Sequence, residues 1–340
     1  MSGIRGLKDE PMHDKNPTNP ANPCSFGAGA SGWRCWRWIA LASTLFVMLG
    51  CSLLAPLPTL APTSSPILTL PPSVTPWPTL APPATPLPTA TPEPVDTGWL
   101  QLQPGVELRL LQVRVEIGDA SENASRAERG VLIERLHVVR VDPAAVRFRV
   151  LYEPGRPLPV DAWYRRLDPP PLLVINGGYF TPEDETVGVL VSDGEVWGTP
   201  YGDFAGMFAV DANDGVSIRW FRIWPYDATE PLAQAIQSFP VLIKPGGVMG
   251  FPADADDGRP ARRTVVALDR QGRLLFIVAP RGYLGLHNLA CFLANSDLAL
   301  DVALNLDGGY STGMWLQAGE RSVEIHSYVP VPSVLAVFSR

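Results

Sequence analysis

The chain has 340 residues, of which 27 are Lys or Arg and 34 are Asp or Glu, giving a formal net charge of −7. A nucleic-acid-binding domain normally presents a clustered basic face, so this acidic balance argues against nucleic acid as a partner. The composition changes along the chain and predicts three parts: residues 1–50, a Pro-rich segment at 51–96, and one folded domain at 97–340.

The first part contains an uncharged apolar stretch, Ile39–Leu49, that follows Arg34 and Arg37. Its length and flanking charges are typical of a signal peptide. The stretch ends in Leu49-Gly50-Cys51, which resembles the bacterial lipobox, where a cysteine receives lipid and becomes the new N-terminus. We therefore expect removal of residues 1–50, lipidation of Cys51, and an extracytoplasmic protein held at the membrane through its lipid anchor.

An uncleaved anchor from Trp38 to about Leu54 is the alternative, and it also places most of the chain outside the cytoplasm. Under the first interpretation Cys24 and Cys35 are removed with the signal peptide, which leaves Cys291 as the single thiol of the domain. No His or Asp frames Cys291 in the sequence, so we expect it to be a buried structural thiol rather than a nucleophile.

Residues 52–95 hold 14 prolines, and Glu93 is their only charged residue. Such a segment buries too little apolar surface to offset the entropy of ordering it. The pattern predicts a disordered, extended tether with a reach on the order of 100 Å.

Runs of β-branched residues predict strands along the folded domain, and Asp193-Gly194, Asn213-Asp214-Gly215 and Arg270-Gln271-Gly272 predict hairpin turns between some of them. The expected strands are 106–117, 131–141, 146–152, 172–175, 188–191, 195–197, 207–210, 216–221, 263–268, 273–278, 302–306, 314–316 and 334–338.

Two helices are expected as well. Asp227 and Glu230 have the spacing of a capping box that opens a helix through about Gln237, and Gly285–Asn295 has leucines at helical spacing. These elements predict an α+β fold, with an antiparallel or mixed β-sheet core and a few packing helices in a single domain.

Two glycine loops follow apolar strands: Asn176-Gly177-Gly178, and Asp307-Gly308-Gly309 with Ser311 and Thr312 just beyond it. Paired glycines let the backbone approach a ligand closely, although tight turns with hydrogen-bonding Asx residues would have the same pattern. Neither loop has the spacing of a nucleotide-binding motif. Because three apolar strands, 172–175, 265–268 and 302–306, end near these polar groups, we expect them to be neighbours in one core and their ends to form one shared rim. The two loops should then lie side by side at the same end of the sheet, with Arg263 between or beside them.

The chain from about Leu172 to the C-terminus resembles the phosphodiester glycosidase family, which includes the lysosomal enzyme that removes N-acetylglucosamine from a mannose phosphate. The resemblance is carried in order by blocks at 176–180, 188–194, 237–243, 263–272 and 303–312, and Leu306-Asp307-Gly308-Gly309-Tyr310-Ser311 is the most specific of them.

The resemblance implies hydrolysis of a sugar-1-phosphodiester, with release of a free sugar and a phosphomonoester. Asp307 and Asn176 are the implied catalytic residues, and Arg263 is the implied phosphate donor, although a solvated strand residue is the alternative for it. The implied substrate-binding set is completed by Gly177, Gly178, Gly308, Gly309, Ser311 and Thr312. No cofactor is implied, and a divalent cation at Asp307 is compatible with the sequence but no His or Cys spacing demands one.

Two departures from the family bear on catalysis rather than on fold: Ala279-Pro280-Arg281, where many members continue into an Asp-Gly pair, and Val329–Pro332, where the lysosomal member carries an arginine. A second carboxylate of the kind that a conventional glycosidase uses is not identifiable. The leading hypothesis is a surface-tethered hydrolase of envelope or extracellular glycans. A non-catalytic glycan-binding lipoprotein and an envelope scaffold for a protein partner are the alternatives.

Overall fold

The structure is a computed structural model that describes residues 95–117 and 130–340. The expected signal peptide, Cys51 and nearly all of the tether lie outside these ranges. Val95, the first described residue, already bonds to the sheet, because its carbonyl accepts from the Gln112 N–H at 2.8 Å. No helix within the described ranges is long and apolar enough to cross a membrane.

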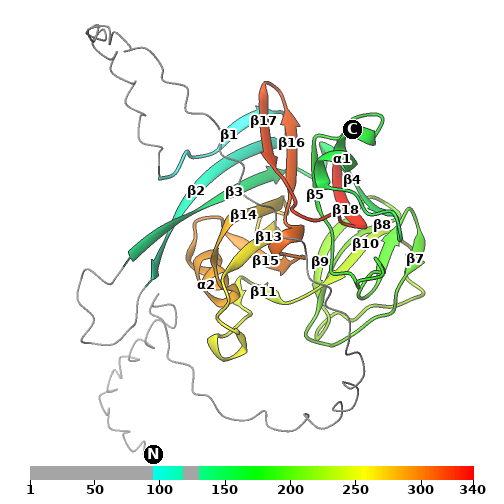
Figure 1. The fold of residues 1–340 in the computed structure, drawn as a ribbon. Coiled ribbons are helices and arrows are strands. Elements are labelled where there is room, and N and C mark those ends of the chain that lie inside the picture. The colour runs from blue at the N-terminus through cyan, green and yellow to red at the C-terminus, as the bar shows by residue number, and fades with distance from the viewer. Residues whose placement is uncertain (1–94, 118–129) are drawn as a thin grey trace, which may run out of the picture. The chain divides into compact units, whose positions relative to one another are not determined.

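The described residues form three sheets, and every strand pair in them is antiparallel (Figure 1). In its spatial order the first sheet contains β1 (Leu100–Gln103), β2 (Val106–Ile117), β3 (Gly130–Val141), β14 (Leu274–Leu284), β13 (Ala261–Asp269), β15 (Leu300–Asn305), β11 (Val241–Lys244) and β12 (Val248–Met249). The second contains β17 (Arg321–Ile325), β16 (Met314–Ala318), β5 (Leu173–Asn176), β18 (Ser333–Ser339) and β4 (Val146–Tyr152). The third contains β7 (Glu195–Trp197), β6 (Leu190–Ser192), β10 (Leu232–Ser238), β8 (Gly206–Asp211) and β9 (Val216–Trp220).

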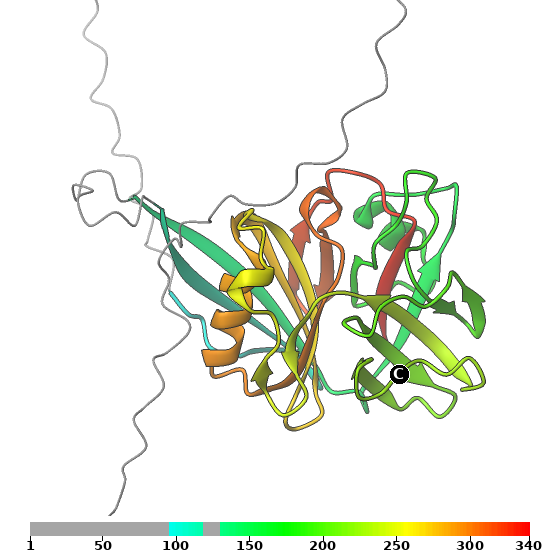
Figure 2. The same ribbon diagram turned by 90° about the horizontal axis from the view of Figure 1, so that it is seen from below.

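One face of each sheet contributes to a common central core. Successive side chains of a strand point to opposite faces, so Val266 of β13 enters this core while Val265 and Ala267 face outward. Phe148 of the second sheet meets Phe208 of the third and Phe276 of the first, at ring-centroid distances of 6.0 and 6.4 Å. The three rings therefore lie where the three sheets meet. In Figure 2 the first sheet lies at the left of the ribbon and the third sheet at the right.

Two helices cover outward faces. The helix α2 (Leu286–Asn295), which confirms the expected helix at 285–295, packs its leucines on the outer face of the first sheet. The helix α1 (Val160–Arg166) was not expected from the sequence, and its buried Trp163 packs against the outer face of the second sheet. Two short 3₁₀ turns, η1 (Ala253–Ala255) and η2 (Gly309–Ser311), complete the described elements.

The prediction of a helix from Asp227 to Gln237 is wrong, because residues 232–238 form β10 in the middle of the third sheet. Pro231 interrupts any helix that starts at Asp227, and the following residues are buried between β6 and β8. The Asp227 carboxylate accepts from the Thr229 N–H at 2.8 Å, and Glu230 forms an ion pair with the buried Arg219 at 2.5 Å. The fold is consequently largely β rather than α+β.

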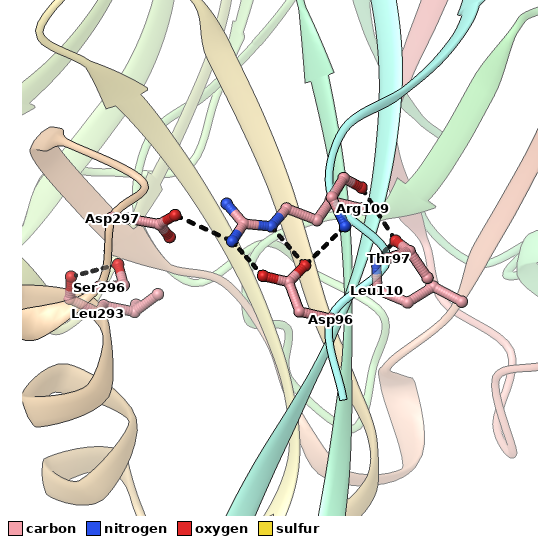
Figure 3. Close-up of polar contacts among 8 residues, drawn as sticks. Asp96, Thr97, Arg109, Leu110, Leu293, Ser296 and Asp297 are labelled. Carbon is pink, nitrogen blue, oxygen red and sulfur yellow. Dashed lines mark hydrogen bonds and ion pairs between the residues drawn. The ribbon is translucent and has the colours of Figure 1, made fainter. Parts of the chain in front are cut away.

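The first described residues are attached to the first sheet by an arginine between two carboxylates (Figure 3). Arg109 of β2 is only 6% exposed, and its guanidinium forms ion pairs with Asp96 at 2.5 Å and with Asp297, beyond the end of α2, at 3.0 Å. The hydrogen bond from Arg109 holds the pKa of Asp96 below its ordinary value. The contact joins the start of the described chain to the segment that follows α2.

Candidate active site

Asn176, the last residue of β5, connects the two glycine loops. Its side chain is fully buried, and Nδ2 donates to the carbonyl oxygen of Asp307 at 2.8 Å. Its Oδ1 accepts from Thr264 Oγ1 at 2.7 Å and from the Gly313 N–H at 3.1 Å. The Asp307 N–H donates in turn to the Gly177 carbonyl at 3.2 Å, so the two loops lie side by side as expected.

The three strands share one core as expected, but the loops meet across two sheets, which corrects the expectation that they lie at the same end of one sheet. The strands β13 and β15 are neighbours in the first sheet, with Val265 opposite Asn305, whereas β5 lies in the second sheet beside β18 and β16. All three strands have buried faces on the central core, and this is why runs from different sheets have the same apolar pattern.

Three of the glycines are required by close packing of the protein on itself. A Cβ at Gly177 would lie 2.2 Å from Ser333 Oγ, and a Cβ at Gly308 would lie 2.8 Å from the Arg262 carbonyl oxygen. A Cβ at Gly178 would likewise lie 2.9 Å from Ile236. These glycines thus let the first loop approach β18 and β10 and the second loop approach β13, in addition to any approach to a ligand.

The carboxyl group of Asp307 has the environment of an acid–base group. Its Oδ1 accepts from the Gly308 N–H at 2.7 Å, and the Ser311 hydroxyl donates to the same carboxylate. Burial raises the pKa of Asp307 to about 6 from an ordinary value of 3.8, against the opposing effect of these hydrogen bonds. Near neutral pH the group therefore exchanges a proton readily, which general acid–base catalysis requires.

Tyr179 and Asn305 lie beside this carboxyl group. The Tyr179 hydroxyl accepts from Asn305 Nδ2 at 2.8 Å, and burial followed by the charge of Asp307 raises the pKa of Tyr179 to about 12. Asn305 is 1% exposed, and its Oδ1 has no hydrogen-bond partner among the described residues. Asn305 was not among the predicted site residues, although its place at the end of β15, two residues before Asp307, was an available signal.

Arg263 borders both the second glycine loop and a cavity of about 520 Å³. Its Cδ is 3.9 Å from the position that a Cβ would take at Gly308. Its Nε donates to the Leu284 carbonyl at 3.3 Å and Nη2 donates to the Arg259 carbonyl at 2.9 Å, so the side chain is held along the cavity wall. Burial lowers the pKa of Arg263 from its ordinary value, but an arginine keeps its charge at any physiological pH. Tyr179 lines the same cavity.

The hydroxyl residues of the second loop and Arg281 have different surroundings. Ser311 is 6% exposed and binds Asp307, whereas Thr312 is fully buried and its hydroxyl has no partner among the described residues. The Arg281 guanidinium donates to the Ile133 carbonyl on β3 at 2.8 Å, which directs it toward that strand. No three His, Cys, Asp or Glu side chains cluster in a metal-binding arrangement within the described ranges.

Cys291 is buried as expected, but the inference that no histidine frames it is wrong. His287 Nε2 lies 3.4 Å from Cys291 Sγ, because the two residues are four positions apart on α2 and therefore share one face. The His287 Nδ1 lies 3.0 Å from the Phe251 carbonyl, and Met249 Sδ lies 3.6 Å from the thiol. With 2% exposure, the thiol has little access to a substrate.

Comparison with known proteins points to one family. Residues 171–338 match the sequence profile of the family described as phosphodiester glycosidase. No curated protein sequence matches the chain.

Solved structures show related folds. The auto-inhibited catalytic domain of zebrafish N-acetylglucosamine-1-phosphodiester alpha-N-acetylglucosaminidase has a TM-score of 0.53 at 18% identity, over 70% of this chain and 85% of that chain. A hypothetical protein from Synechocystis has a TM-score of 0.46 at 16% identity, over 71% of this chain and 63% of that chain. At these identities the likeness to the zebrafish domain concerns the fold, and the weaker likeness adds nothing to it.

Proposed function

Because residues 171–338 place the chain in the phosphodiester glycosidase family, we propose that it hydrolyses sugar-1-phosphodiesters, with Asp307 as the reacting carboxylate. The observation that carries this proposal is the convergence of Asp307, Tyr179 and Arg263 around the two glycine loops, beside a cavity of about 520 Å³. A cavity of this size accommodates a small ligand.

In the proposed reaction, water adds to the anomeric carbon and the bond from that carbon to the phosphate oxygen breaks. The Asp307 carboxylate accepts a proton from the attacking water, and the phosphomonoester leaves with the bonding electron pair. A conventional glycosidase needs a second carboxyl group to protonate a leaving alcohol. A phosphomonoester is itself a stable anion with a second pKa of about 6, so one carboxylate suffices.

Asn176 acts in this scheme as a positioning residue. Its hydrogen bonds to Asp307, Thr264 and Gly313 engage both ends of its amide with the protein. It holds the carbonyl of the residue that reacts, and its side chain is fully buried. This differs from the catalytic role that the family resemblance implied.

Arg263→Ala is expected to raise KM by about 10- to 150-fold, because it removes a charge-assisted contact to phosphate worth about 1.5–3 kcal/mol. The measurement is steady-state hydrolysis of a panel of sugar-1-phosphodiesters by the purified protein. Arg259→Ala is the matched control, since Arg259 lines the same cavity with its side chain 86% exposed. An unchanged KM for Arg263→Ala would remove this residue from phosphate recognition, and binding without any turnover would favour a glycan-binding protein.

We also propose that the protein acts outside the cytoplasm as a lipoprotein on envelope or extracellular glycans. The support comes from the apolar stretch that ends at Cys51 and from the Pro-rich segment that follows it. Mass spectrometry of membrane-extracted protein is expected to find a lipid-modified peptide that begins at Cys51. Cys51→Ser should abolish this processing and Cys35→Ser should preserve it, whereas an intact peptide spanning residues 40–55 would support the uncleaved anchor.

A further inference from the structure

Two tyrosine rings stand exposed beside the second glycine loop. Tyr310 is 70% exposed and Tyr328 is 67% exposed, and their ring centroids are 6.0 Å apart. Their backbones are joined, because the N–H groups of Tyr328 and Val329 donate to the Tyr310 carbonyl at 2.7 and 3.3 Å. The two rings therefore keep a defined separation although they come from different loops.

A buried arginine supports one of these rings. The Arg262 guanidinium lies 4.2 Å from the ring centroid of Tyr328, and its Nη2 donates to the His326 carbonyl at 2.9 Å. Arg262 is 7% exposed, and no carboxylate forms an ion pair with it in the described part of the chain. The cation–π contact therefore offsets part of the free energy that burial of the Arg262 charge costs. It also holds one face of the Tyr328 ring against the guanidinium.

Tyr310 belongs to the loop that carries the proposed reacting group, and the Tyr328 backbone is bonded to it. Tyr310 precedes Ser311, whose hydroxyl binds Asp307, and Gly308 packs directly on the Arg262 carbonyl. Arg262 contacts Tyr328 and the His326 carbonyl, whereas Arg263 donates to the Leu284 and Arg259 carbonyls and lines the cavity. Gly308, which follows Asp307, packs against both arginines: a Cβ there would lie 2.8 Å from the Arg262 carbonyl oxygen and 3.9 Å from Arg263 Cδ.

We propose that Tyr310 and Tyr328 form a stacking subsite for the pyranose ring whose anomeric carbon faces Asp307. This rests on the proposed function: if Arg263 takes the phosphate on one side of that carbon, the sugar extends to the other side, where the tyrosines stand. The C–H groups on the apolar face of a pyranose carry partial positive charge and pack against the negative face of an aromatic ring. Rings that are exposed but held in place lose little entropy on binding such a ligand.

The test uses the full chain and four probes: methyl N-acetylglucosaminyl phosphate, methyl glucosyl phosphate, dimethyl phosphate and the neutral disaccharide chitobiose. Binding is measured by calorimetry and saturation-transfer NMR in an Asp307→Asn background, which prevents turnover. Adding Tyr310→Ala or Tyr328→Ala is expected to weaken the preferred sugar phosphodiester about 3- to 10-fold, the usual worth of an aromatic contact, and to leave dimethyl phosphate unaffected. Tyr310→Phe should bind normally, and Trp224→Ala, which removes another exposed ring, is the matched control.

The outcomes separate the two proposals. Tyrosine-dependent binding of a sugar phosphodiester or of chitobiose supports the subsite, even if the wild-type protein hydrolyses nothing and the proposed function fails. Hydrolysis by wild type with sugar binding that is unchanged in both tyrosine variants overturns the subsite alone. Absence of any sugar binding to the parent protein overturns the subsite as well. Melting temperatures within about 2 °C of the parent show that the exposed substitutions left the fold intact.

Discussion

Asp307→Asn is expected to lower kcat for a sugar-1-phosphodiester by about 10²- to 10⁴-fold, the usual contribution of a general base. Asn keeps the oxygen that accepts from the Gly308 N–H but cannot accept the proton of the attacking water. Asp301→Asn is the control, because Asp301 lies on β15, the strand before Asp307, and its carboxylate accepts from the Gly246 N–H at 2.9 Å. An Asp307→Asn variant with full activity would remove Asp307 from the chemistry and leave the cavity as a binding site.

The same substitution is expected to stabilise the fold at neutral pH. Burial raises the pKa of Asp307 to about 6 in the folded state, above its ordinary value of 3.8, so ionisation is easier in the unfolded chain. The resulting loss of stability begins near pH 4, is complete just above pH 6, and amounts to about 1–2 kcal/mol after allowance for solvent screening. The melting temperature of Asp307→Asn should therefore exceed that of wild type at pH 7 and match it at pH 4.

The pH dependence of activity provides a separate measurement on Asp307. A general base must be ionised, so kcat/KM of the wild-type protein should rise with pH through about 6 and then level off. A profile that falls through pH 6 would indicate that the protonated form of Asp307 reacts and that this carboxyl group acts as an acid.

Asn176→Ala is expected to lower the free energy of unfolding by about 3–5 kcal/mol, because it leaves several buried polar groups without partners at once. The stranded groups are the Thr264 hydroxyl, the Gly313 N–H and the Asp307 carbonyl. Urea unfolding measures the effect. Thr264→Val, which removes a single hydrogen bond of the same network, should cost about 1–2 kcal/mol. A loss below about 1 kcal/mol for Asn176→Ala would mean that water replaces the amide and that the loops are held together by other contacts.

Much of the fold could be predicted because its strands carry their burial pattern locally. Val146–Tyr152 alternates buried and exposed side chains, and β2 has the predicted bounds, 106–117. The helix expected at 227–237 failed for a related reason. The strand β10 is buried on both faces, so its sequence lacks the alternation of apolar and polar residues that identifies a strand. The spacing of Asp227 and Glu230 before it therefore indicated a helix that does not form.

The two loops were predictable because residue type alone was informative there: glycine pairs after apolar strands indicated both. The choice of Asp307 as the catalytic residue came from the family resemblance and stays a prediction. Asn305 and Arg262 escaped notice because their roles depend on contacts between distant segments, such as the 2.8 Å bond from Asn305 to the Tyr179 hydroxyl. The strand β5 pairs with β18 and not with β13, and this pairing also depends on contacts between distant segments, so no local sequence pattern predicts it.

The meeting of Phe148, Phe208 and Phe276 in the central core has a consequence for how the protein would tolerate change. The two glycine loops belong to different sheets, so their alignment is inherited from the fit of these rings and of the apolar side chains around them. A small rotation of one sheet against another would displace Tyr179 from Arg263 and Asp307 well before any strand came apart. Substitutions at the three phenylalanines should therefore lower the rate of hydrolysis before they lower the melting temperature. The residues allowed at these positions are limited by the alignment of the two loops as well as by the packing of the core.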